Sequence, residues 1–127
     1  MNLRPLNNEA TNAANAVAAG LKQARARAMA NTSAYRLVVA GSGSLIAEHA
    51  VSCTSTNWTP DSRYDVRLDF EATLAAYVGG ELVEPGEVAA CFNSRGFAQT
   101  SSEFNFTGRD GRTRQVELFV GGAVEIR

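Results

Sequence analysis

The chain has 127 residues, of which 45% are hydrophobic and 20% are charged, so it fits one folded domain with a buried core. Its formal net charge of −1 excludes a protein that binds nucleic acid through its overall charge. No stretch approaches the roughly 20 consecutive apolar residues that a membrane-spanning helix needs. Basic groups dominate residues 1–37 and acidic groups dominate residues 38–94, an unevenness that we expect to produce solvated surfaces of mixed charge.

The first thirty residues predict one long amphipathic helix. Small and apolar side chains recur there every three or four positions and form a single stripe: Leu3, Leu6, Ala10, Ala13, Val17, Leu21, Ala24 and Ala28. We expect the helix to run from about Asn8 to about Ala30, with Asn31 closing it. Many alanines favour the helix. Gly20 weakens it but allows another backbone to approach the helix closely. Because the stripe consists of small side chains, we expect the helix to lie close against a sheet.

After residue 32 the sequence predicts short strands separated by turns. Strands are expected at residues 35–40, 45–51, 64–70, 74–78, 88–92, 104–106, 114–120 and 123–126. Residues 54–63 are expected to form a loop, and Gly121-Gly122 a two-residue hairpin turn. The alternation over 64–70 predicts an apolar face of Tyr64, Val66, Leu68 and Phe70, opposite an exposed face of Asp65, Arg67 and Asp69. The predicted fold class is α+β, a long N-terminal helix packed on antiparallel sheets. We expect one domain over 1–127, with 1–31 helical and 32–127 rich in strands.

Two cysteines, Cys53 and Cys91, are compatible with a disulfide in an oxidising compartment. Such a bond would enclose a long loop and stabilise the fold by roughly 4 kcal/mol in the chain-entropy model. The alternative is a pair of reduced, buried thiols, because cysteines on strands can pair only if their positions meet in space. We expect the disulfide, with the reduced pair as its alternative.

Signals for catalysis and metal binding are poor. His49 is the only histidine and lies four residues from Cys53, so a small hydrolase with a Cys–His dyad is conceivable, unless the cysteine is already in a disulfide. The histidine and cysteines lack the spaced pairs of a zinc site. Asp61, Asp65 and Asp69 could offer oxygens to calcium, although a ladder of surface charges explains the last two as well. We therefore expect no catalytic residue, no metal and no cofactor.

Four arginines gather on the last predicted hairpin and on the loop before it: Arg109, Arg112, Arg114 and Arg127. They could contact DNA phosphates without reading the base sequence. Glu117 and Glu125 lie on the same hairpin and dilute its positive charge. The alternative role for these arginines is therefore cross-strand salt bridges.

Four segments follow one another in an order that is typical of one family. They are Leu-Lys-Gln-Ala-Arg-Ala-Arg-Ala at 21–28, Tyr-Arg-Leu-Val-Val at 35–39, Cys-Phe-Asn-Ser-Arg-Gly-Phe-Ala at 91–98, and the closing hairpin at 116–127. Together they resemble the soluble part of a minor pseudopilin or minor type IV pilin of the GspH/FimT type. The family's hydrophobic prepilin segment, with its cleavage glycine, is not in this sequence, so we expect the chain to be the soluble part of such a protein.

The resemblance implies a non-enzymatic subunit that joins other pilin or pseudopilin subunits, or primes their assembly, in a type IV pilus or a type II secretion pseudopilus. It implies that the helix lies on the sheet with its other side facing neighbouring subunits, and that the small-residue stripe, from Leu6 to Ala28, packs on both. It also implies an inner-membrane precursor, anchored by the N-terminal segment that this sequence lacks, and then a periplasmic or surface location in a filament. The alternative is a DNA-binding minor pilin that acts in DNA uptake, or natural transformation, through the C-terminal arginines.

Overall fold

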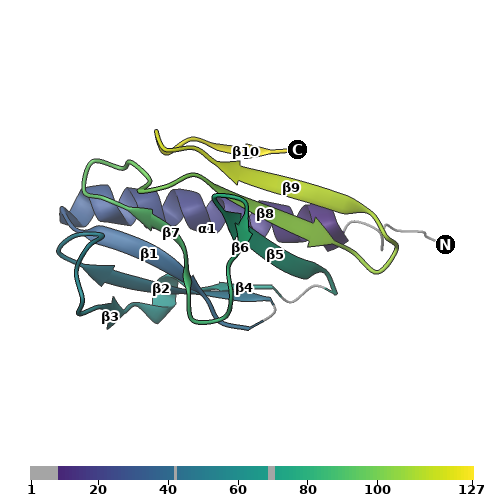
Figure 1. Cartoon of the computed structure of the whole chain (residues 1–127), viewed down its shortest axis with the longest axis horizontal. Coiled ribbons are helices and arrows are strands. Elements are labelled where there is room, and N and C mark those ends of the chain that lie inside the picture. The colour runs from purple at the N-terminus through teal and green to yellow at the C-terminus, as the bar shows by residue number, and fades with distance from the viewer. Residues whose placement is uncertain (1–8, 42, 69–70) are drawn as a thin grey trace.

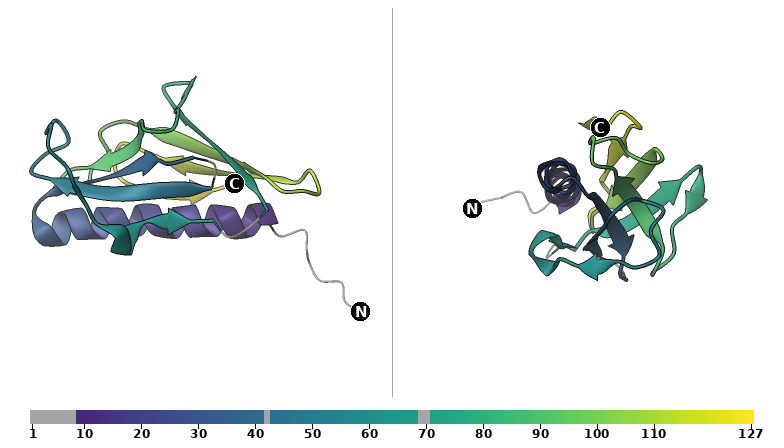
Figure 2. Two further views of the ribbon diagram at one scale, coloured as in Figure 1. Left: turned by 90° about the horizontal axis from the view of Figure 1, so that it is seen from below. Right: turned by 90° about the vertical axis from the view of Figure 1, so that its left-hand side faces the viewer.

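The computed structural model describes residues 9–41, 43–68 and 71–127, and it consists of one long helix lying along two antiparallel sheets (Figure 1). The helix α1 spans Glu9–Asn31, within one residue of the predicted bounds. Seen end-on, both sheets lie on the same side of α1 (Figure 2). The predicted α+β fold is confirmed. Leu6 and Asp69 lie outside the described residues.

Each sheet has five strands. The first sheet has the order β3-β2-β1-β7, with β4 paired to β2. Its strands are β1 (Ala34–Val39), β2 (Ser44–Ala50), β3 (Thr59–Pro60), β4 (Val66–Arg67) and β7 (Val88–Phe92). The second sheet has the order β10-β9-β8-β5-β6. Its strands are β5 (Thr73–Val78), β6 (Glu81–Leu82), β8 (Ser102–Thr107), β9 (Thr113–Leu118) and β10 (Val124–Ile126). The chain thus builds most of the first sheet, crosses to the second, returns for β7, and finishes in the second sheet.

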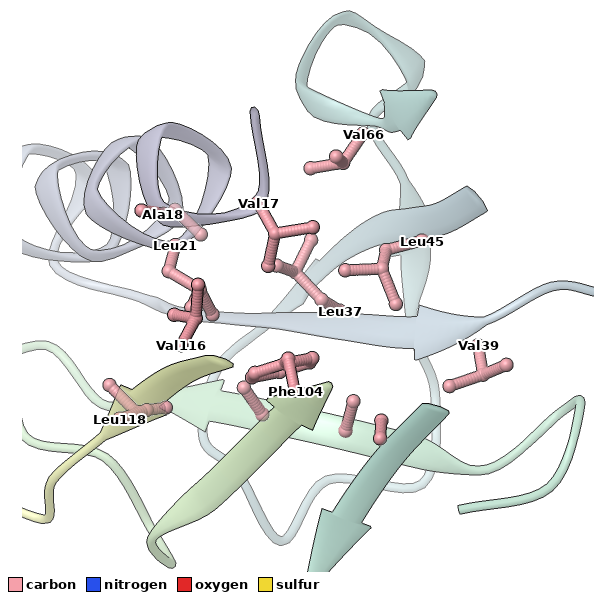
Figure 3. Close-up of a cluster of buried hydrophobic side chains, with 14 of the residues drawn as sticks. Val17, Ala18, Leu21, Leu37, Val39, Leu45, Val66, Phe104, Val116 and Leu118 are labelled. Atoms are coloured by element: carbon pink, nitrogen blue, oxygen red, sulfur yellow. The ribbon is translucent and has the colours of Figure 1, made fainter. Parts of the chain in front are cut away.

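The small residues of α1 let both sheets approach it closely. The buried positions of the helix are Ala10, Ala13, Ala14, Val17, Ala18, Gly20, Leu21, Ala24 and Ala28. Figure 3 shows Val17 and Leu21 directed into the cluster that contains Leu37 of β1 and Val116 of β9. Gly20 is required because a side chain at this position would collide with Val66 of β4. The core therefore lies between the helix and the two sheets, with Phe104 and Phe106 of β8 at its centre.

Two predictions about strands and turns are wrong. Of the strand predicted over 64–70, the described part, 64–68, is extended only at Val66–Arg67, and a 3₁₀ turn occupies Ser62–Tyr64. The reason is that the Asp65 carboxylate accepts the Ala47 backbone N–H at 2.8 Å, so a side chain replaces the next ladder contact. The β9–β10 turn is longer than the predicted two residues. The Phe119 N–H donates to the Ala123 carbonyl, so the turn contains the residues between these two. Residues 54–63 form the predicted loop except for the short strand β3 and the start of the 3₁₀ turn at Ser62.

Candidate interaction surfaces

A disulfide joins Cys53 to Cys91 and anchors the loop at 51–58 on the outer face of the first sheet. Trp58 of this loop stacks over the Arg36 guanidinium, whose carbon lies 4.0 Å from the ring centroid. Arg36 in turn donates to Glu48 across the β1–β2 pair at 2.7 Å. The predicted disulfide is confirmed. Neither cysteine is free, so the conceivable nucleophile of a Cys–His dyad is already consumed.

The remaining candidates for chemistry serve structural contacts. His49 stacks on Tyr35 with ring centroids 5.5 Å apart. The buried Asp61 carboxylate accepts the Tyr35 hydroxyl at 3.0 Å and two bonds from Arg63 at 3.0 and 3.2 Å. The Arg63 hydrogen bonds, opposed by burial, hold the pKa of Asp61 below its usual value. Burial, and then the bond to Asp61, raise the pKa of Tyr35. Within residues 9–41, 43–68 and 71–127, no three histidine, cysteine, aspartate or glutamate side chains are grouped so that they could hold a metal ion.

The predicted subunit-packing stripe lies inside the chain's own core. Ala10, Ala13, Val17, Leu21, Ala24 and Ala28 are each at most 2% exposed. A neighbouring subunit cannot reach side chains that the two sheets already cover, so the prediction that this stripe also packs on neighbours is wrong for these six residues. The opposite face of α1 is exposed and combines polar and small residues: Asn12, Asn15, Ala19, Lys22, Gln23, Ala26 and Ala30.

Two of the C-terminal arginines attach the β8–β9 hairpin to the start of α1. The Glu9 carboxylate accepts the Arg109 backbone N–H at 2.9 Å and its Nε at 2.8 Å, and it pairs with the guanidinium at 2.7 Å. The backbone N–H, and then the side chain, lower the pKa of Glu9. Arg114 donates to the Thr11 hydroxyl at 3.2 Å. These contacts hold the hairpin beside the first turn of the helix.

The other two arginines pair locally and stay mostly exposed. Arg112 lies 3.4 Å from Asp110, and Arg127 pairs with both Glu117 and Glu125. Arg114 and Arg127 line one surface hollow beside β8 and β9. The structure therefore supplies the salt bridges of the alternative interpretation, and it places two of the four guanidinium groups around one exposed hollow.

Comparison with known proteins gives a consistent result at the level of the fold. No family model matches the sequence, and no curated protein matches it. Among solved structures, E. coli GspH superposes with a TM-score of 0.72 at 12% identity, covering 95% of this chain and 89% of that chain. The minor pseudopilin EpsH of the Vibrio cholerae type II secretion system superposes with a TM-score of 0.71 at 13% identity, covering 96% of this chain and 95% of EpsH. The Pseudomonas aeruginosa type IV minor pilin FimU superposes with a TM-score of 0.67 at 16% identity, covering 94% of this chain and 89% of FimU.

The chain has the fold of minor pilins and pseudopilins. Within this pilin-like fold, α1 is the element that leaves a long face uncovered. The resemblance places this other side of the helix toward neighbouring subunits, but sequence reasoning assigned subunit packing to the more hydrophobic stripe and so missed the residues of this face. A second stripe at i, i+3 and i+4 spacing, from Asn12 through Ala19 and Ala26 to Ala30, would have identified it. No helix within the described residues is long and apolar enough to cross a membrane.

Proposed function

We propose that this chain is a non-enzymatic minor pilin or pseudopilin subunit, which joins other pilin-like subunits in a type IV pilus or a type II secretion pseudopilus. One observation carries the proposal: the inner face of α1 is filled by the chain's own sheets, while its outer face is bare along the helix. FimU is a type IV minor pilin and EpsH is a minor pseudopilin of a type II secretion system, and the likeness to both supports the same role here.

The chemistry of the outer face suits a helix neighbour. Ala19, Ala26 and Ala30 are small, so a second helix could approach the backbone closely along that line. Asn12, Asn15 and Gln23 supply hydrogen-bonding groups without a fixed charge. A face of this kind stays compatible with water before assembly and still packs well afterwards.

Binding to other pilin-like subunits of the same organism tests the proposal. We expect the wild-type domain to form a complex with at least one of them in calorimetric titration. Ala19→Arg and Ala26→Arg place long charged side chains on the outer face and should weaken binding by roughly tenfold or more, because the two backbones can no longer approach. Both positions are exposed, so the fold should be unaffected.

Thr56→Arg is the matched control, since it adds the same side chain to the exposed disulfide-anchored loop. It should bind as the wild type does. Failure of the wild type to bind any of these subunits would contradict the assembly role. Equal weakening by the control would show that added charge, rather than the outer face of α1, decides the result.

DNA binding is the second candidate function, favoured by the hollow that Arg114 and Arg127 line. Phosphate contacts there would be independent of sequence and would weaken as salt rises. The double variant Arg114→Glu with Arg127→Glu should abolish retention of a short duplex in a gel-shift assay. Arg67→Glu on β4 is the control and should retain it. Unchanged retention by the double variant would rule out this surface.

A further inference from the structure

Three of the large apolar side chains that the fold leaves exposed lie on segments that meet at the C-terminal end of α1. Met29, Phe97 and Val120 are 41%, 46% and 54% exposed. They belong to the end of the helix, to the turn after β7 and to the β9–β10 hairpin, which gather at one end of the molecule (Figures 1 and 2). Grouped apolar exposure of this kind marks interaction surfaces more often than scattered exposure does.

Close packing and hydrogen bonds hold these three segments together, and we call this contact region the C-terminal junction. Arg25 of α1 donates through its Nε to the Gly96 carbonyl oxygen at 2.8 Å. A Cβ at Gly96 would lie 2.7 Å from the Met29 sulfur, and one at Gly122 would collide with the Gly96 carbonyl oxygen. The Ala98 N–H donates to the Val120 carbonyl at 2.9 Å. The relative positions of the three segments are therefore set before any partner binds.

The exposed ring of Phe97 projects from a pinned turn. The Asn93 side-chain oxygen accepts the backbone N–H groups of Arg95 at 2.9 Å and of Phe97 at 3.1 Å. The Asn93 N–H donates to the Phe97 carbonyl at 2.9 Å. Little backbone entropy is left to lose when a partner covers the ring, which is the property of an energetically dominant anchor.

The charge around the three apolar residues is positive. The second half of α1 and the turn after β7 carry Lys22, Arg25, Arg27 and Arg95 and no acidic residue. The two carboxylates of the neighbouring hairpin, Glu117 and Glu125, both pair with Arg127. The rim is therefore complementary to a partner that presents carboxylates.

We propose that Met29, Phe97 and Val120, with Arg25 and Arg95, form a docking surface for another pilin-like subunit, one that presents an apolar side chain flanked by carboxylates. This surface, the helix-end patch, is separate from the outer face of α1 and rests on the proposed function. Aromatic and arginine side chains are enriched at protein interfaces, which fits this composition. The subunit would then have two contact surfaces, one along its helix and one at the end of it.

Titration calorimetry against other pilin-like subunits of the same organism tests the helix-end patch. Phe97→Ser should lower the affinity roughly thirtyfold, as expected for loss of a dominant anchor. Arg95→Glu should lower it about tenfold, chiefly through slower association at low salt, with a smaller effect at high salt. The matched controls are Leu82→Ser, on β6 at the opposite edge of the second sheet from β10, and Arg67→Glu on β4. Both should bind within about twofold of the wild type.

The outcomes separate the two proposals. If the wild type binds and Phe97→Ser binds equally well, the helix-end patch is overturned while the assembly role stands. If Phe97→Ser abolishes only self-association in sedimentation velocity, or only binding to duplex DNA, the occupant is wrong and the inference is overturned. If the wild type binds none of the subunits, both proposals fail. Circular dichroism melting of each variant confirms that the fold is intact.

Discussion

The two ends of α1 are attached to the sheets by different kinds of interaction. At the N-terminal end, Glu9 pairs with Arg109, whose side chain is 64% exposed, and Thr11 accepts a bond from Arg114. At the C-terminal end, the Asn31 side chain of α1 donates to the Tyr35 hydroxyl at 3.4 Å, and that hydroxyl binds Asp61, which is 8% exposed. One end therefore depends on contacts that water and salt weaken, while the other depends on buried bonds and close packing.

The difference indicates which end can move. Interactions between exposed charges typically contribute little, whereas buried hydrogen bonds and tight glycine contacts are costly to break. We expect the first turn of α1 to open locally at a lower free energy than the last turn. This design keeps the helix-end patch rigid and leaves the other end of the helix adaptable.

Removal of the disulfide should give the largest effect. The double variant Cys53→Ser with Cys91→Ser should lose about 2–4 kcal/mol in the free energy of unfolding, because the unfolded chain gains the freedom of a long loop. Urea denaturation measures the loss. The wild type should show no free thiol in denaturant without reductant, and detection of two thiols, or a loss below about 0.5 kcal/mol, would contradict the structure.

Gly122→Ala should disrupt the C-terminal junction next most strongly. Gly122 has a φ of 97° and faces the Gly96 carbonyl oxygen, so an added methyl group is strained and crowded. We expect a loss of about 2 kcal/mol by urea denaturation. Gly121→Ala, one residue earlier, meets nothing within 4 Å and should change stability by less than about 0.5 kcal/mol. Equal losses in the two variants would refute the junction.

Asp61→Asn should weaken the C-terminal end by about 1–2 kcal/mol, because it removes charge from hydrogen bonds with Tyr35 and Arg63. The folded-state pKa of Asp61 lies below the ordinary value of 3.8. The stability that its ionised form supplies is therefore complete above that value and is lost as the pH falls through the folded-state pKa. Unfolding curves across this acid range should be less pH-dependent in Asp61→Asn, whereas the exposed control Glu84→Gln should follow the wild type.

Glu9→Gln should give the smallest global effect and a distinct local one. Its pKa is also lowered, so the contact is formed above the ordinary value of 4.5 and lost as the pH falls through the folded-state pKa. Hydrogen exchange should speed up at the Arg109 amide and in the first turn of α1, with the last turn unchanged. High salt should reproduce part of this change in the wild type. Faster exchange at both ends would remove the contrast between them.

Local pattern predicted most of the fold, and long-range contacts account for what it missed. The helix, the disulfide and most strands follow from periodicity, composition and cysteine count, which act through neighbouring residues. The prediction of a strand over 64–70 is wrong because the Asp65 side chain accepts the Ala47 backbone N–H. The alternation of polar and apolar residues cannot reveal this contact. The Arg109 partner lies 100 residues away at Glu9, so the sequence showed a cationic cluster where the structure shows an attachment point.

The most direct test of the assembly role is photo-crosslinking in the intact cell, with a photoreactive amino acid placed on the outer face of α1. We predict that position Ala19 or Ala26 crosslinks to another pilin-like subunit, identified by mass spectrometry. Position Thr56, on the disulfide-anchored loop, should give no such product. Absence of a pilin-like partner at both helix positions, or crosslinks to that partner from Thr56 alone, would contradict the account.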